Sequence, residues 1–219
     1  MAEREILVYF DATRDPAKNL SREEEIFEMV EGGRLPELVR FWVNAECLVR
    51  GKAKSEKYGW YDEGLARAMG INIIERGTGG GVVYHDEGNL NWSFFLRTSE
   101  AFLSPTAAFD GVSKYIVKAL GTLGVRAQFS PPNRIDVSNR KVSGMAAKST
   151  VRTLLVHGTL LLDSDLEKLN LLCIPPPGCP PVANIGDWVK GVDTTTIVRA
   201  LARVLHDSGF SVRMTDALP

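Results

Sequence analysis

Apolar residues in this chain fall into many short runs and a few longer amphipathic segments. Short runs rich in Val, Ile, Leu and aromatic residues predict strands. These runs cover residues 5–10, 37–43, 47–50, 71–75, 82–85, 90–97, 125–129, 134–137, 141–145, 151–162 and the late segment FSVRM. Apolar positions at helical spacing predict helices over 61–69, 106–122, Asp165 to 172, and Asp193 or Thr194 to 207, with an earlier helix opened by NLSREEEIFEMV.

Local patterns also predict how these elements begin and pair. Ser21 is followed three residues later by Glu24, the spacing of a capping box, which predicts the start of the first helix. The strands at 82–85 and 90–97 flank the turn sequence HDEGN, which predicts that they pair with each other. Strands outnumber helices, so we expect an α+β fold with a mixed, mostly antiparallel sheet flanked by helices. No linker divides the chain, which predicts one domain over 1–219 with a terminal helical subdomain from about 183 to 219.

Composition narrows the classes of protein further. The chain has 219 residues, 44% of them apolar, and a formal net charge of −1. This charge argues against a nucleic-acid or membrane-surface protein, and no apolar run approaches the ~20 residues of a bilayer span. The charged N-terminus MAEREILVYF does not have the pattern of a signal peptide. Cys47, Cys173 and Cys179 form no disulfide framework, which favours free thiols in a reducing cytoplasm.

The stretch ERGTGGGVVYHDEGN, residues 75–89, is the first candidate binding segment. Gly79, Gly80 and Gly81 leave bare backbone that can approach a phosphate or carboxyl group and point N–H groups at it. A tight turn between two strands is the plainer interpretation. Polar side chains flank this backbone at Arg76, Thr78, His85 and Asp86. Their convergence favours a binding loop, although neither a dinucleotide motif nor a P-loop is present.

Two further clusters contain a lysine and a histidine. In PPNRIDVSNRKVSG, Lys141 lies between predicted strands and precedes Ser143 and Gly144. Its ammonium can stabilise charge on a phosphoryl or carbonyl oxygen, although an edge-strand lysine can also serve only to prevent aggregation. In HGTLLL, Gly158 follows His157 inside a long apolar strand, which indicates a bulge or a close backbone contact. A buried structural histidine explains that motif as well as a catalytic one does.

Taken together, these clusters resemble the lipoate–protein ligase A family, within the superfamily of biotin/lipoate ligases and octanoyltransferases. The segment ERGTGGGVVYHDEGNLNWSF is similar to the family pattern RRxSGGGxVxHDxGNLNxSF. PPNRIDVSNRKVSG is similar to GxNDIxVxGxKISG, and HGTLLLDSDLEKL to HGTLLxxxDxxxL. NLSREEEIF and LVRFWVNAECLVRG resemble the opening helix and the paired strands of the family. The segments occur in the family's order and at compatible spacing.

The resemblance implies a biotin/lipoate ligase-like catalytic domain and chemistry in two steps. Members activate lipoate with ATP and Mg2+ to lipoyl-AMP and then pass the lipoyl group to a lysine of a carrier domain. The implied catalytic residue is Lys141, which contacts the acyl carbonyl and the α-phosphate. The implied contacts to lipoyl-AMP and ATP are Arg76, Thr78, Gly79, Gly80, Gly81, Val82, His85, Asn133, Asp136, Ser143, Gly144, His157 and Gly158. Asp136 is also the candidate Mg2+ ligand.

The resemblance implies partners as well. The carriers are apo lipoyl domains of 2-oxoacid dehydrogenase acyltransferase subunits and the glycine cleavage H protein. Many members carry a C-terminal accessory domain, which in some is a separate polypeptide needed for adenylation. We expect this chain to be a catalytic subunit of the second kind, with the lysine-containing loop GKAKSEK able to close over the adenylate.

Departures from the family pattern leave alternatives open. Glu75 stands where the pattern has arginine and Arg134 where it has aspartate, which Asp136 can replace only if the strand register shifts. One alternative is an octanoyl or lipoyl transferase that uses a cysteine thioester. Cys173 and Cys179 lie in the right region for it, but its Pro-Cys-Gly motif is not reproduced. A second alternative is a non-catalytic paralogue that binds acyl adenylate. Biotin ligation is disfavoured, because its GRGRxGRxW and KxGGI patterns are absent from the sequence.

Overall fold

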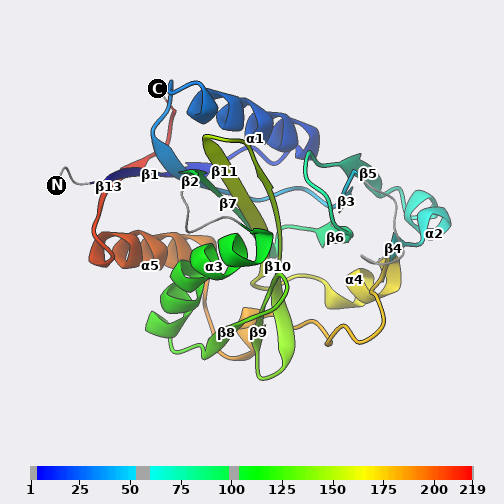
Figure 1. Cartoon of the computed structure of the whole chain (residues 1–219). Coiled ribbons are helices and arrows are strands. Elements are labelled where there is room, and N and C mark those ends of the chain that lie inside the picture. The colour runs from blue at the N-terminus through cyan, green and yellow to red at the C-terminus, as the bar shows by residue number, and fades with distance from the viewer. Residues whose placement is uncertain (1–3, 53–59, 99–103, 219) are drawn as a thin grey trace.

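The computed structural model describes residues 4–52, 60–98 and 104–218 (Figure 1). Its strands are β1 (Arg4–Asp11), β2 (Glu37–Trp42), β3 (Cys47–Arg50), β4 (Trp60–Tyr61), β5 (Asn72–Glu75), β6 (Val82–His85), β7 (Asn89–Arg97), β8 (Ala127–Ser130), β9 (Arg134–Val137), β10 (Arg140–Ser149), β11 (Thr153–Leu161), β12 (Cys173–Ile174) and β13 (Phe210–Thr215). Its helices are α1 (Pro16–Glu31), α2 (Glu63–Ala68), α3 (Pro105–Thr122), α4 (Leu166–Leu172), α5 (Thr194–Asp207) and the short 3-10 helix η3 (Ile185–Asp187).

An eight-stranded main sheet runs through the molecule in the order β13-β1-β2-β7-β11-β10-β9-β8. β1 lies parallel to both β13 and β2, whereas the pairs from β2 to β8 are antiparallel. The predicted α+β class and the mixed, mostly antiparallel sheet are therefore confirmed.

Helices cover both faces of the main sheet (Figure 1). α3 and α5 pack on one face, where Ile116 and Leu201 are buried with Phe94 of β7. α1 packs on the other face, where Ile26 is buried with Phe95 of the same strand. Because successive side chains of a strand point to opposite faces, one apolar strand serves both layers of the core. The face under α1 also carries the candidate site.

A three-stranded sheet with the order β5-β3-β6 lies beside the main sheet and α1 (Figure 1). β3 pairs in parallel with β5 and antiparallel with β6. A two-stranded pair of β4 and β12 joins this side of the molecule to α4. The glycine run connects β5 to β6, so both ends of the predicted binding loop are fixed in this small sheet.

The first helix begins earlier than the capping-box pattern predicts. The side chain of Asp15 accepts the N–H groups of residues 17 and 18, and Pro16 occupies the first helical position. Aspartate at the cap followed by proline is the stronger start signal, since proline lacks the N–H that would otherwise be unsatisfied there. The predicted start at Ser21 is wrong, and that hydroxyl donates to Glu25 within the helix.

The predicted pairing of the strands around HDEGN is also wrong. β6 pairs with β3 in the small sheet, whereas β7 pairs with β2 and β11 in the main sheet. The turn carries the chain from one sheet to the other and packs closely at Gly88. A Cβ atom on Gly88 would lie 2.1 Å from the carbonyl oxygen of Asp163. The local pattern correctly predicts two strands here, but distant segments determine their partners.

The last part of the chain completes the main sheet and its helical layer. Leu201 and Leu205 of α5 belong to the same core cluster as α3, and β13 pairs with β1. The predicted division of 1–219 into one domain with a terminal subdomain stays a prediction. Within the described ranges, no helix has both the length and the apolar character needed to cross a bilayer.

Candidate active site

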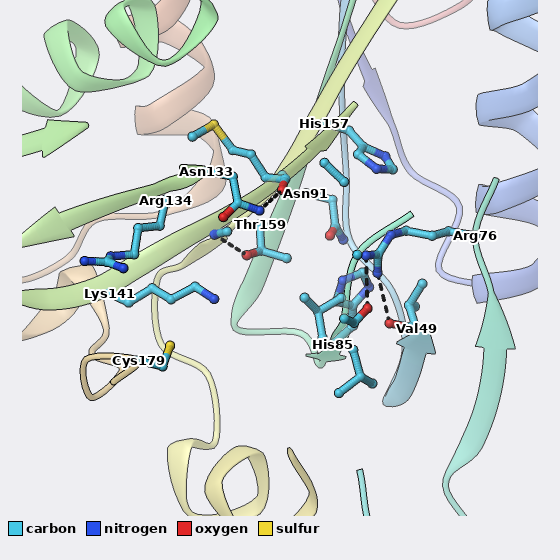
Figure 2. A pocket seen from close by; sticks show the side chains of 18 of the residues that line it. Val49, Arg76, His85, Asn91, Asn133, Arg134, Lys141, His157, Thr159 and Cys179 are labelled. Carbon is cyan, nitrogen blue, oxygen red and sulfur yellow. Dashed lines mark hydrogen bonds between the residues drawn. The ribbon is translucent and has the colours of Figure 1, made fainter. Parts of the chain in front are cut away.

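A cavity of about 360 Å³ lies between the main sheet and the small sheet, under α1. Its walls come from β7, β10 and β11, from β3 and β6, and from the loops at 80–81, 132–133 and 176–179. Figure 2 shows Lys141 and Arg134 on one side and Arg76 and His85 on the other. Asn91 lies between these two sides. The cavity therefore has a cationic side formed by β9 and β10 and a second side formed by the small sheet.

Most predicted site residues line this cavity. They are Arg76, Gly80, Gly81, Val82, His85, Asn133, Lys141, Gly144, His157 and Gly158. Thr78, Gly79, Asp136 and Ser143 do not line it, although each is adjacent in sequence or in contact with a residue that does. Most of the predicted residues therefore gather around one cavity, while the assignment of the site and the roles of its residues stay predictions.

Arg76 holds the backbone of the glycine run in place. Its Nη1 donates to the carbonyl oxygen of Val49 at 3.2 Å, and its Nη2 donates to those of Gly79 at 2.8 Å and Gly81 at 3.0 Å. Burial lowers the pKa of Arg76 to about 10, so the guanidinium stays protonated at neutral pH. In the described part of the chain, the N–H groups of residues 79–81 donate to no protein acceptor. These amides are therefore available to bind an anion.

The glycine run also packs against another bare segment. The N–H of Gly51 donates to the carbonyl oxygen of Gly81 at 3.1 Å. A Cβ atom on Gly51 would lie only 2.3 Å from the carbonyl oxygen of Gly80. Gly80 has a φ of +96°, a conformation that favours glycine. Glycine is therefore needed on both sides of this contact, which sets the position of the loop.

A buried chain of hydrogen bonds connects α1 to the glycine run. The Glu23 carboxylate contacts Nδ1 of His157 at 2.9 Å, and Nε2 of His157 contacts the Thr78 hydroxyl at 2.8 Å. Nε of Arg76 donates to the same hydroxyl at 3.0 Å. Burial raises the pKa of Glu23, but His157 and the hydroxyl of Ser93 outweigh it and lower the pKa to about 2. The carboxylate is therefore ionised and anchors the loop through His157.

Lys141 lies on β10 next to a register shift between Lys141 and Ser143. Its backbone is held by Pro181, whose carbonyl oxygen accepts the Lys141 N–H at 2.8 Å. A Cβ atom on Gly144 would lie 3.1 Å from Nζ of Lys141, so glycine gives this side chain its space. In the described ranges Nζ has no hydrogen-bond partner or ion pair. A cation that lines a cavity without a partner is well suited to an anionic ligand.

Arg134 and Asp136 pair with each other on β9. Nε of Arg134 donates to the two carboxylate oxygens of Asp136 at 3.1 and 2.9 Å. Asp136 is 4% exposed and does not line the cavity. Beside them, Asn133 donates to the carbonyl oxygen of Met145 at 2.7 Å. A metal-binding role for Asp136 would require the Arg134 contact to be released.

Neutral polar side chains line the middle of the cavity. Nδ2 of Asn44 donates to Nδ1 of His85 at 3.0 Å, which leaves the proton of the neutral ring on Nε2. Burial, reinforced by the charge of Arg76, lowers the pKa of His85 to about 3. Thr159 accepts the N–H of Gly144 at 3.3 Å. His85 is therefore a neutral hydrogen-bond donor at neutral pH and not a cation.

The two candidate thioester cysteines differ in position. Cys179 lines the cavity from the loop at 176–179, on the side of Lys141 (Figure 2). Cys173 does not line it, and burial raises the pKa of its thiol to about 12. Because the thiolate is the reactive form, Cys173 is a poor nucleophile, and only Cys179 keeps the thioester alternative open.

The structure adds site residues that the sequence analysis missed. They are Glu23, Trp42, Asn44, Asn91 and Thr159. The sequence did contain a signal for Asn91. The polar residues Asn89, Asn91 and Ser93 occupy alternate positions of a strand that is otherwise apolar, which indicates a polar face. Lys54 and most of the GKAKSEK loop lie outside the described residues. Throughout the described ranges, no three His, Cys, Asp or Glu side chains gather closely enough to hold a metal ion.

Comparison with solved structures defines the class of the fold as biotin/lipoate ligase-like. A lipoate-protein ligase A solved with bound ATP gives a TM-score of 0.83 at 23% identity, covering 97% of this chain and 89% of that one. A bipartite lipoate protein ligase from Thermoplasma acidophilum, studied with its E2 lipoyl domain, gives a TM-score of 0.80 at 22% identity, covering 99% and 87%. At these identities the likeness establishes the fold.

Sequence comparison establishes the family. The model of the lipoyl protein ligase A/B catalytic domain matches residues 15–206, so the chain belongs to that family. Lipoate–protein ligase 1 of Staphylococcus aureus is 34% identical over 164 residues, which are 74% of this chain and 48% of that protein. Lipoate-protein ligase LplJ of Bacillus subtilis is 33% identical over 154 residues, 70% and 44% of the two chains. The chain spans about half the length of the curated relatives it matches.

Proposed function

We propose that this chain is the catalytic part of an ATP-dependent lipoate–protein ligase. One observation carries the proposal: Lys141, Gly80 and Gly81 line one cavity, and in the described part of the chain the ammonium of Lys141 and the N–H groups of these glycines have no protein partner. Both groups can bind an acyl adenylate. In this mixed anhydride a single oxygen atom joins the acyl carbonyl carbon to the α-phosphate. Family membership supports the same assignment.

The first half-reaction activates lipoate. A carboxylate oxygen of lipoate attacks the α-phosphorus of ATP, a new P–O bond forms, and the bond to pyrophosphate breaks. Lys141 stabilises the charge that develops on the α-phosphate, and the amides of the glycine run bind its oxygens. Arg76 keeps those amides in position through its contacts with the carbonyl oxygens of Gly79 and Gly81.

The second half-reaction transfers the lipoyl group. The neutral amine of a carrier lysine attacks the acyl carbonyl, and AMP leaves with the electrons of the broken C–O bond. The attacking nitrogen loses one proton to solvent as the amide forms. Lys141 stabilises the negative charge on the carbonyl oxygen. The proposed carriers are apo lipoyl domains of 2-oxoacid dehydrogenase acyltransferase subunits and the glycine cleavage H protein. The bipartite ligase studied with its E2 lipoyl domain supports the first of these.

We also propose that adenylation requires a separate accessory polypeptide, by analogy with the bipartite ligase of Thermoplasma acidophilum. ATP enters as its magnesium complex, since Mg2+ commonly binds through substrate phosphates and one or two carboxylates. Asp136 is the proposed carboxylate, although Arg134 holds it in this structure. The proposed compartment is the cytoplasm, with which the three free cysteines are compatible.

The proposed function is tested by following the intact mass of an apo lipoyl domain. One sample contains the chain with lipoate, ATP and Mg2+, and a second contains it with preformed lipoyl-AMP. We expect a gain of one lipoyl group in the second sample, and in the first only once an accessory polypeptide is added. Absence of any gain from lipoyl-AMP by the folded protein contradicts the proposal and favours a non-catalytic, adenylate-binding paralogue.

A further inference from the structure

The cavity has more positive charge than one phosphate requires. Among the described residues that line it, the charged side chains are Arg76, Arg134 and Lys141, and none is an aspartate or glutamate. Nε, Nη1 and Nη2 of Arg76 all donate to the glycine run and to β3, so this guanidinium is committed to holding the loop. The cations left for a ligand are Lys141 and Arg134, which indicates a ligand with more than one anionic group.

Arg134 and Lys141 are close neighbours on β9 and β10. Arg134 is the direct cross-strand partner of Gly144. A Cβ atom on Gly144 would lie 3.1 Å from Nζ of Lys141, so the ammonium lies beside the residue that Arg134 opposes. Like charges at such positions repel each other across a sheet. An anion that contacts both side chains removes this repulsion.

Asp136 orients Arg134 without occupying its forked end. Nε of Arg134 donates to both carboxylate oxygens, at 3.1 and 2.9 Å. Within the described ranges, Nη1 and Nη2 of Arg134 donate to no protein acceptor. The side chain of Asp136 is 5% exposed and that of Arg134 is 29% exposed, so the pair is anchored at its buried end. The N–H groups of Nη1 and Nη2 remain available, in the planar geometry that suits phosphate oxygens.

The two cations lie at different depths. Figure 2 shows the ammonium of Lys141 turned toward the middle of the cavity and the guanidinium of Arg134 turned toward its outer edge. The proposed function places the α-phosphate at Lys141. A chain of phosphates that continues outward from that position reaches Arg134.

We propose that Arg134 binds the β- and γ-phosphates of ATP, with Asp136 as its positioning residue. The inference deepens the proposed function and rests on it. The phosphate of lipoyl-AMP is bound by Lys141 and the glycine amides, which leaves Arg134 for the two phosphates that only ATP contains. The arginine that departs from the family pattern at this position thus adds a phosphate-binding group.

The experiment compares the affinities of the chain for ATP and AMP by calorimetry. EDTA is present, so that Mg2+ is removed and only the protein's own groups contact the phosphates. We expect the wild type to bind ATP about tenfold or more tightly than AMP. Arg134→Gln keeps a polar side chain without the charge, and is expected to lower this ratio by about tenfold while the affinity for AMP is unchanged.

Two further variants accompany Arg134→Gln. Arg140→Gln is the matched control, because it removes the same charge from the adjacent strand but lies outside the cavity, where Arg140 contacts Asp187 at 3.4 Å. It should keep the wild-type ratio. Arg134→Gln alone leaves the Asp136 carboxylate buried without its cation, which can prevent folding. Arg134→Gln combined with Asp136→Asn removes both charges, and the same loss of ATP preference is expected from it.

Lipoyl transfer from preformed lipoyl-AMP separates the inference from the proposed function. Arg134→Gln should transfer at the wild-type rate, because lipoyl-AMP has no β- or γ-phosphate. A wild type that transfers lipoyl groups but binds ATP no better than AMP overturns the inference alone. So does an unchanged ratio in the folded variants, or a transfer rate that falls in Arg134→Gln, which would assign Arg134 to the carrier or the adenylate. A wild type that transfers no lipoyl group contradicts the proposed function, and the inference falls with it.

Discussion

The Glu23 carboxylate lies 2.9 Å from Nδ1 of His157, although the two residues are 134 positions apart in the chain. This contact joins the first helix to the strand that forms the middle of the main sheet. Through Thr78 it extends to the glycine run, so a side chain that does not line the cavity helps to position the loop that does. Glu23 is therefore a positioning residue, and it can be tested separately from the groups that touch substrate.

The substitution Glu23→Gln removes the buried charge and keeps the side-chain volume. We expect it to lower the free energy of unfolding by about 1–3 kcal/mol at neutral pH, because His157 loses its ionised partner. The pKa of Glu23 is about 2 in the folded protein and 4.5 ordinarily. Its stabilising contribution is therefore complete above about pH 4.5 and is lost as the pH falls toward 2.

Urea unfolding at several pH values measures this effect. The difference between the wild type and Glu23→Gln should be largest at neutral pH and shrink below about pH 4.5. Glu25→Gln, on an exposed position of the same helix, should show little difference. A wild-type advantage that is absent at neutral pH, or that grows as the pH falls, would contradict the assignment of an ionised Glu23.

The buried ring of His85 predicts a second pH dependence of stability, in a different pH range from that of Glu23. Its pKa is lowered to about 3 from 6.5, so below about pH 6.5 the unfolded chain takes up a proton that the folded protein does not. This group therefore makes stability fall as the pH drops from about 6.5 toward 3.

The NMR spectrum of the ring nitrogens checks this directly. In the folded protein His85 should keep the neutral form protonated on Nε2 from about pH 8 down to about pH 5, and it should titrate once the protein is unfolded in urea. A charged His85 ring in the folded protein at neutral pH would contradict this prediction.

The contact between Gly51 and the glycine run predicts a strong positional effect. Gly51→Ala places a methyl group 2.3 Å from the carbonyl oxygen of Gly80, a backbone atom that can move only with its loop. We expect a loss of about 1–3 kcal/mol in stability and a larger relative loss of lipoyl transfer, since the loop amides move. Gly121→Ala in α3 is the control, because among the described residues no atom apart from its chain neighbours and its own helix backbone lies within 4 Å of the added methyl group. Gly121→Ala is expected to stabilise the helix by about 0.5–1 kcal/mol.

The cysteine alternative leads to a simple prediction. A ligase forms no covalent bond to Cys179, so Cys179→Ser should transfer lipoyl groups from lipoyl-AMP at the wild-type rate. Thioester catalysis would instead be abolished by this substitution, since a serine hydroxyl is not a comparable nucleophile at neutral pH. Complete loss of transfer in a folded Cys179→Ser protein would therefore move the assignment to the transferase class.

Much of the fold could be predicted from the sequence because its local patterns are strong. Nearly every predicted strand and helix is present, including the final strand at 210–215. The failures concern long-range contacts. β6 and β7 are close in sequence but lie in different sheets. β6 pairs with β3 and β7 pairs with β11, so the short turn between β6 and β7 does not determine their pairing. A periodic pattern predicts that a strand exists and which face it buries, but not its neighbour.

Site residues that belong to sequence motifs could be predicted. Single side chains that contact the site from distant parts of the sequence could not. Lys141 and the glycine run belong to recognisable segments, and they meet in one cavity. Glu23 lies in the acidic run REEE, which suggests a solvated helix face. Its spacing to Ile26, Phe27 and Val30 places it on the buried face, a signal that charge composition obscured.

The most direct test of the account is the single-turnover rate of lipoyl transfer from preformed lipoyl-AMP to an apo lipoyl domain, compared between the wild type and Lys141→Ala. Lys114→Ala, which removes an exposed lysine of α3, serves as the control. We predict that Lys141→Ala remains folded and slows transfer by about 100-fold or more, because the developing charge loses its stabilising cation. Transfer by Lys141→Ala at the wild-type rate would contradict the central claim that this ammonium performs the chemistry.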